Sequence, residues 1–123
     1  MARYKVLLVD DEEELVRALA ERLEIRQLEC EVALNGEEAL RMVEDNPPQL
    51  ILLDLKMPGM DGMEVLRRVK KSHPEIQVVV LTGHGSESDE QIVRRLGAID
   101  YLQKPVDIRE LVKALDYAYA ARE

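Results

Sequence analysis

Short apolar segments alternate along this chain with segments of helical periodicity, and this alternation restricts the chain to few fold classes. Five short runs carry the apolar character: residues 4–9, 32–34, 50–53, 76–81 and 98–102. Three of them are apolar at nearly every position, and the last is the weakest. Such runs are typical of strands that are covered on both faces of a parallel sheet. We therefore expect five parallel strands with helices between them.

The intervening segments show the period and the start signals of helices. The last of them has the clearest apolar stripe, formed by Ile108, Leu111, Val112, Leu115 and Tyr119. The first repeats leucine every four residues, at Leu15, Leu19 and Leu23. Residues that favour helix starts precede four of the segments: Asn35, Asp61, Ser86 or Ser88, and Asp107. Five strands alternating with five helices imply right-handed crossovers and an α/β, doubly wound sheet.

Length and charge exclude several classes of function. The chain has 123 residues, enough for one domain over 1–123, and a net charge of −8, which opposes direct binding to nucleic acid or to anionic membranes. The single cysteine, Cys30, forms no internal disulfide and builds no zinc site. No apolar run has the length of a membrane span, and the first residues lack the layout of a signal peptide. We predict a cytoplasmic protein.

Polar side chains follow four of the predicted strands at the point where each strand ends. They are Asp10 and Asp11 after the first, Asp54 after the third, Thr82 at the end of the fourth and Lys104 after the fifth. Each alone has an ordinary explanation as a helix-start, turn or surface residue. In a doubly wound sheet, however, these ends meet where ligands bind. Three crowded carboxylates call for a hard divalent cation, and oxygen ligands point to Mg²⁺ rather than zinc.

Asp54 lies within an apolar run, between residues 50–53 and Leu55. A carboxylate in that setting is partly removed from water, which is costly unless the group is paired or performs chemistry. Such a carboxylate can act as a nucleophile and form an aspartyl phosphate. The phosphoryl transfer would need mainly positioning and charge neutralisation.

With these residues in place, the sequence resembles the response regulator receiver domains of two-component signalling. The resemblance extends from residue 5 to about residue 118 and depends on four motifs in order: VLLVDDE at 6–12, LLDLKMPGMDG at 52–62, LTGHG at 81–85 and GAIDYLQKP at 97–105. It implies a flavodoxin-like fold with strand order 2-1-3-4-5. It also implies that Asp54 accepts a phosphoryl group from a histidine kinase or a phosphotransfer protein.

The resemblance further implies a metal site. Asp11 and Asp54 would bind Mg²⁺ directly, together with the backbone carbonyl of Lys56, and Asp10 would act through a water molecule. Mn²⁺ could substitute for Mg²⁺. A flavodoxin-like cofactor binder is disfavoured, because the acidic residues at 10–14 would repel a cofactor phosphate.

The remaining site residues also take their roles from the resemblance. Lys104 would contact the phosphoryl oxygens, Thr82 would hydrogen-bond one of them, and Tyr101 would be the aromatic residue that turns inward when Thr82 moves. Tyr101 could also be a partly buried aromatic residue of the strand and nothing more. The bond between Lys104 and Pro105 matches one that is usually cis in the family.

Two further positions, Lys56 and His84, correspond to family positions that influence hydrolysis of the aspartyl phosphate, and we expect them to tune dephosphorylation. Lys56 could instead pair with Glu12 or Glu13 across the mouth of the site. Two alternatives to the phosphoacceptor function stay open: a degenerate receiver that only binds proteins, and a magnesium-dependent phosphatase. The phosphatase is the less favoured, because it needs an acid where Lys56 stands.

The output of the domain is less constrained. We expect no enzyme activity beyond self-phosphorylation from donors and slow autodephosphorylation. The fourth helix, fifth strand and fifth helix would form the switching face toward a downstream protein or a fused output domain, and its charged residues allow a monomer or a phosphorylation-dependent dimer. The chain is either a stand-alone regulator or part of a longer protein.

Overall fold

The computed structural model describes residues 3–83 and 85–122 and contains a five-stranded parallel sheet with five helices. The elements follow one another as β1 (Lys5–Val9), α1 (Glu13–Ile25), β2 (Glu29–Ala33), α2 (Gly36–Asp45), β3 (Leu50–Leu53), α3 (Gly62–Ser72), β4 (Gln77–Thr82), α4 (Glu87–Arg95), β5 (Asp100–Gln103) and α5 (Ile108–Ala120). The strand order is β2-β1-β3-β4-β5, so the predicted doubly wound fold and its order are confirmed.

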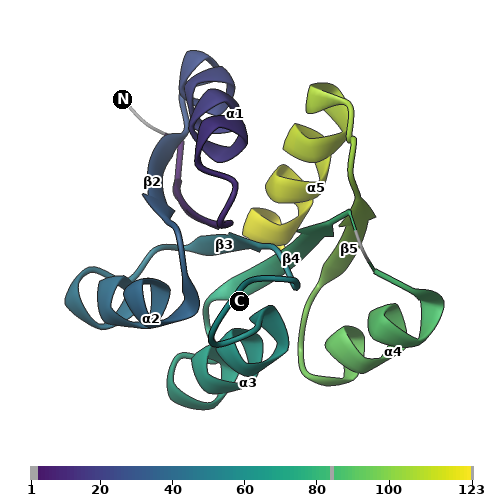
Figure 1. The fold of residues 1–123 in the computed structure, drawn as a ribbon. Helices are drawn as coiled ribbons and strands as arrows, with labels where there is room; N and C mark the ends of the chain where they lie inside the picture. Colours follow the sequence, from purple (N-terminus) through teal and green to yellow (C-terminus); the bar gives the residue numbers. More distant parts are fainter. Residues whose placement is uncertain (1–2, 84, 123) are drawn as a thin grey trace.

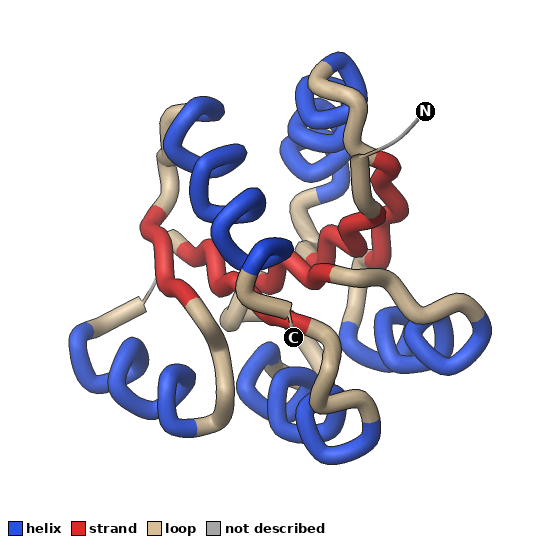
Figure 2. Tube along the Cα trace, turned by 180° about the vertical axis from the view of Figure 1, so that it is seen from behind, coloured by secondary structure: helices blue, strands red, loops and turns tan. Residues whose placement is uncertain are grey.

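The sheet separates two layers of helices. Helices α1 and α5 cover one face, and α2, α3 and α4 cover the other, as Figure 1 and the reverse view in Figure 2 show. Each layer has its own apolar core, because alternate residues of a strand point to opposite faces. Val6 and Leu8 of β1 pack with α1 and α5, whereas Leu7 and Val9 pack in the core of the α2–α4 layer. This double coverage accounts for the nearly continuous apolar strands.

The register of the sheet aligns the carboxyl ends of its central strands. Val9 pairs with Leu53, and Leu53 pairs with Val80. The ladder continues one residue further, where the N–H of Asp54 donates to the Val9 carbonyl at 2.9 Å and the N–H of Lys104 donates to the Thr82 carbonyl at 3.0 Å. The residues just after the strands therefore emerge at one edge.

The four predicted helix starts are confirmed. Asn35, Asp61, Ser86 and Asp107 each cap a helix through the side chain, and Ser86, rather than Ser88, forms a reciprocal capping box with Asp89. Within the described residues, no helix is both long and apolar enough to cross a bilayer.

The predicted apolar stripe of α1 is wrong in part. The buried face of α1 consists of Val16, Ala20 and Leu23, whereas Leu15 is 48% exposed. Leu15 stays outside the core because it lies on the side of α1 that faces the loop after β5. There it lines an open depression together with Val106.

Both outer strands differ in their bounds from the prediction. Strand β2 is an edge strand that begins three residues earlier than expected, at Glu29, and only Ala33 of it is buried. Strand β5 also lies at an edge and spans Asp100–Gln103 instead of 98–102. Edge strands are covered less completely, so their apolar pattern marks their ends poorly.

At the other end of the strands, an aromatic contact joins the residue before β1 to α5. The ring of Tyr4 stacks on the ring of Tyr119 with centroids 4.7 Å apart, and the Tyr4 hydroxyl donates to Asp116 at 2.7 Å. Burial and the neighbouring Asp116 raise the pKa of Tyr4, so the phenol stays protonated and remains a donor. The contact ties the end of α5 to the start of the sheet.

Candidate functional site

Three carboxylates converge where β1 and β3 end. Asp10, Asp11 and Asp54 each offer an oxygen, and these atoms all lie within 4.8 Å of one another. Asp10 and Asp54 are buried, whereas Asp11 is exposed. Like charges at this separation repel unless a cation lies between them. The geometry thus fits the predicted divalent-cation site, with its ligands at the open edge of the sheet.

The loop after β3 fixes the position of Asp54. The backbone of Gly62 packs so closely against Asp54 and Leu55 that a side chain at this position would overlap the Asp54 carbonyl oxygen. The N–H of Gly62 also donates to the Leu55 carbonyl at 2.9 Å. A loop that folds back this tightly requires glycine, because glycine lacks Cβ. The motif glycine at 62 therefore serves to place the phosphoacceptor candidate.

Burial controls the electrostatics of Asp54. The residue is 4% exposed, and its Oδ1 atom has no hydrogen-bond partner among the described residues. Removal from water raises the pKa of Asp54. The positive charge of Lys104 lowers this pKa, and the negative charge of Asp10 raises it further. The side chain of Thr82 and the backbone of Lys56 lower the pKa more weakly. The result is a buried carboxylate with few partners, one oxygen of which is unpaired among the described residues.

Lys104 reaches into the same cluster from the loop after β5. Its Nζ atom lies 2.7 Å from Asp10 Oδ2, 3.0 Å from Glu12 Oε1 and 3.9 Å from Asp54 Oδ2. Burial works against the charge of Lys104, but hydrogen bonds to Asp10 and Glu12 outweigh it and raise the pKa. The Lys104–Pro105 bond is cis, as the resemblance implied.

Sequence reasoning missed Glu12 as a partner of Lys104. The acidic run at 10–14 was the available signal, but it does not reveal which of its side chains faces a lysine 92 positions away.

Thr82 and Tyr101 lie beside the site on β4 and β5. Thr82 is fully buried, and Tyr101 is 9% exposed. The Tyr101 hydroxyl lies 3.5 Å from the carbonyl of Ser86, and a Cβ at Gly85 would collide with that hydroxyl. The ring is therefore packed beneath the loop between β4 and α4, where movement of Thr82 and movement of this loop would both affect it. His84 lies outside the described residues.

Lys56 does not pair across the mouth of the site. Its Nζ atom lies 4.0 Å from Asp89 in the first turn of α4. The suggested pairing with Glu12 or Glu13 is wrong, because Lys104 holds Glu12 and Arg17 holds Glu13 at 2.8 Å. Lys56 is thus directed toward α4.

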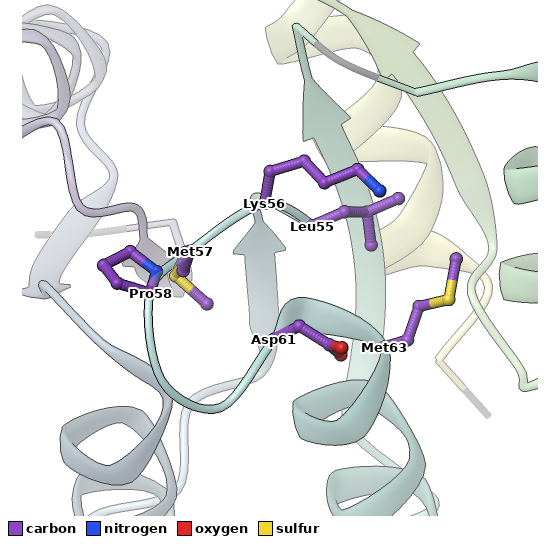
Figure 3. A pocket seen from close by; sticks show the side chains of 6 residues that line it. All are labelled: Leu55, Lys56, Met57, Pro58, Asp61 and Met63. Carbon is purple, nitrogen blue, oxygen red and sulfur yellow. The ribbon is translucent and has the colours of Figure 1, made fainter.

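The loop after β3 also borders a shallow cavity. Figure 3 shows the side chains that line this cavity of about 340 Å³: Leu55, Lys56, Met57, Pro58, Asp61 and Met63. In that view Lys56 and Met63 reach to one side of the loop, and Met57 and Pro58 lie on the other. None of the three clustered carboxylates lines this cavity, so the cavity and the acidic site are separate features of the same edge.

Comparisons with known proteins agree with the geometry. The family model of the response regulator receiver domain matches residues 6–116. The transcriptional regulatory protein CpxR of Escherichia coli K12 is 44% identical over 108 residues, which cover 88% of this chain and 46% of CpxR. The Klebsiella pneumoniae CpxR is 43% identical over the same length. The chain spans about half the length of these curated relatives.

Solved structures show the same fold. A CheY-like receiver domain from Methanospirillum hungatei JF-1 superposes with a TM-score of 0.92 at 29% identity, covering 96% of this chain and 94% of that one. NtrX from Brucella abortus superposes with a TM-score of 0.91 at 32% identity and covers 99% of this chain, which corresponds to 28% of NtrX.

Proposed function

This chain belongs to the response regulator receiver domain family of two-component systems, and from that premise we propose that Asp54 accepts a phosphoryl group from a histidine kinase or a phosphotransfer protein. Residues 1–123 would act as one receiver unit. The observation that carries the proposal is the setting of Asp54: a buried carboxylate with an unpartnered oxygen, two more carboxylates within 4.8 Å and a lysine at 3.9 Å.

The transfer requires little of the protein beyond positioning. A carboxylate oxygen of Asp54 attacks the phosphorus of a phosphohistidine, the P–N bond breaks as the P–O bond forms, and the leaving imidazole takes up a proton. The fixed backbone at Gly62 holds Asp54 in place, so the nucleophile loses little conformational entropy when it reaches the reactive geometry. Lys104 moves from its carboxylate partners to the phosphoryl oxygens, and Thr82 donates its hydroxyl to one of them.

The acidic cluster suits Mg²⁺, with Mn²⁺ as a substitute. The residues that would hold the ion are Asp11, Asp54 and the backbone carbonyl of Lys56, with Asp10 acting through water. When bound, the ion supplies positive charge that offsets the carboxylates and the incoming phosphoryl oxygens. The close approach of the carboxylates, two of them buried, fits this group.

Phosphorylation would change the face formed by α4, β5 and α5. Thr82 would move toward the phosphoryl group, and Tyr101, packed under the loop before α4, would follow. We propose that this face controls a downstream protein or a fused output domain, as a monomer or as a phosphorylation-dependent dimer. With a net charge of −8, the domain itself would not contact nucleic acid, and we propose a cytoplasmic location.

The test is the intact mass of the protein after incubation with Mg²⁺ and acetyl phosphate. The expected result is one phosphoryl adduct on the wild type, none on Asp54→Asn, and none when a chelator is present. An adduct that persists in Asp54→Asn would contradict the assignment of the acceptor. Absence of any adduct, under conditions that label another receiver, would favour a domain that only binds proteins.

The lifetime of the adduct tests the tuning positions. Lys56→Ala and His84→Ala should change the decay rate of the aspartyl phosphate, measured by mass after removal of the donor. An unchanged decay in both variants would end that proposal. Release of inorganic phosphate from unrelated phosphomonoesters, with turnover, would instead indicate the phosphatase.

A further inference from the structure

Two carboxylates hold the lysine of the site, and one of them lies outside the acidic cluster. Lys104 Nζ is 3.0 Å from Glu12 Oε1, within hydrogen-bond distance, whereas it is 3.9 Å from Asp54 Oδ2 and makes no hydrogen bond there. The remaining partner is Asp10 at 2.7 Å. In this arrangement the ammonium group that would contact the phosphoryl group lies closer to Glu12 than to Asp54.

The start of α1 explains why Glu12 is available. Glu12 occupies the position before the first helical residue, where a side chain often caps the helix, but its carboxylate makes no capping hydrogen bond. Its N–H donates to Asp10 Oδ1 at 3.0 Å, which fixes the backbone beside the site. The side chain is 59% exposed and free to reach Lys104. The next glutamate, Glu13, is engaged by Arg17 instead.

We propose that Glu12 is a positioning residue that competes with the phosphoryl group for Lys104 and thereby sets how readily Asp54 is phosphorylated. This inference rests on the proposed phosphoacceptor function. Glu12 and the phosphoryl oxygens are both anionic and attract the same ammonium group, so the ion pair with Glu12 weakens the contact that Lys104 can make with the phosphoryl group. The exchange makes and breaks no covalent bond, and Glu12 acts only through Lys104.

The test is the rate of phosphorylation by acetyl phosphate at saturating Mg²⁺, comparing the wild type with Glu12→Gln. The variant keeps the shape of the side chain and removes its charge. We expect the rate to rise about two- to fivefold, the range that the loss of one exposed ion pair supports. Added salt, which screens exposed pairs, should raise the wild-type rate more than the rate of the variant.

Glu14→Gln is the matched control, because Glu14 is an exposed residue of the same acidic run and the substitution changes the net charge equally. A rate for Glu12→Gln that is no higher than that of Glu14→Gln would overturn the inference, since general charge would then explain the effect. A shift in the half-saturating Mg²⁺ concentration in Glu12→Gln alone would also overturn it, because Glu12 would then act on the cation. Melting curves confirm that both variants fold. If neither the wild type nor Glu14→Gln is labelled, the proposed function fails first.

Discussion

Replacing Asp54 by asparagine should stabilise the metal-free protein at neutral pH. Asp54 is 4% exposed, its Oδ1 atom lacks a partner among the described residues, and burial raises its pKa. A charge held in that environment opposes folding. Asparagine removes the charge and keeps the shape. Lys104 retains Asp10 and Glu12 as partners in the variant, so no cation is left unpaired.

The size of the effect follows from the burial of that oxygen. Asparagine keeps a polar atom at this position and removes only the charge, so the gain is the excess cost of an ionised over a neutral buried group, which we take as about 1–3 kcal/mol. At about 2.1 cal/mol/K of unfolding entropy per residue, a chain of 123 residues gains about 4 °C in melting temperature for each kcal/mol. The expected increase for Asp54→Asn is therefore about 4–12 °C.

The pH dependence has a definite sign. Because the pKa of Asp54 is higher in the folded protein than in the unfolded chain, the folded state keeps this proton to higher pH. The wild type therefore loses stability as pH rises through the raised pKa. The advantage of asparagine should be absent in acid and complete above that pKa.

Thermal melts followed by circular dichroism, with a chelator present, measure this difference across pH. Glu14→Gln is the control, because it removes the same charge from an exposed carboxylate outside the acidic cluster and should change stability by no more than about 0.5 kcal/mol. Saturating Mg²⁺ should stabilise the wild type and narrow its gap to Asp54→Asn. An Asp54→Asn variant that melts no higher than the wild type at neutral pH would refute the reasoning.

Three other substitutions test contacts around the sheet. Lys56→Ala should shorten the lifetime of the aspartyl phosphate severalfold, because it removes a half-exposed side chain two residues after the phosphoacceptor, where the family resemblance places an influence on attack by water. Mass measurements after donor removal follow the decay. Gly85→Ala should displace the Tyr101 hydroxyl, visible as changed Tyr101 ring signals in NMR, and unchanged signals would contradict the packing. Tyr4→Phe should cost about 1 kcal/mol of unfolding free energy in denaturant melts, since it removes the hydrogen bond to Asp116.

The sequence by itself determined the architecture and the main site residues. Apolar strands and helix-starting residues act over a few positions, so their patterns survive in the chain without tertiary information. Since parallel strands end at a common edge, the sequence alone indicates that Asp10, Asp54 and Lys104 lie together, as they do. The resemblance added their roles.

Only the tertiary structure decided which partner each charged side chain takes. Glu12 pairs with Lys104, 92 positions away, and Lys56 turns to Asp89. Three carboxylates lie within 4 Å of Lys104, and exposed pairs differ by about 1 kcal/mol or less, so no local pattern selects the partner of a lysine.

Tertiary packing also decided which side chains are buried in the first helix and in the edge strand β5. Leu15 fits the period of a buried stripe, yet it lies toward the loop after β5 and is half exposed. Tyr101 lies in an edge strand but is buried, because Gly85 leaves room for its ring. Both outcomes depend on segments that are distant in sequence and meet only when the sheet has formed, and packing between such segments is a property of the folded chain.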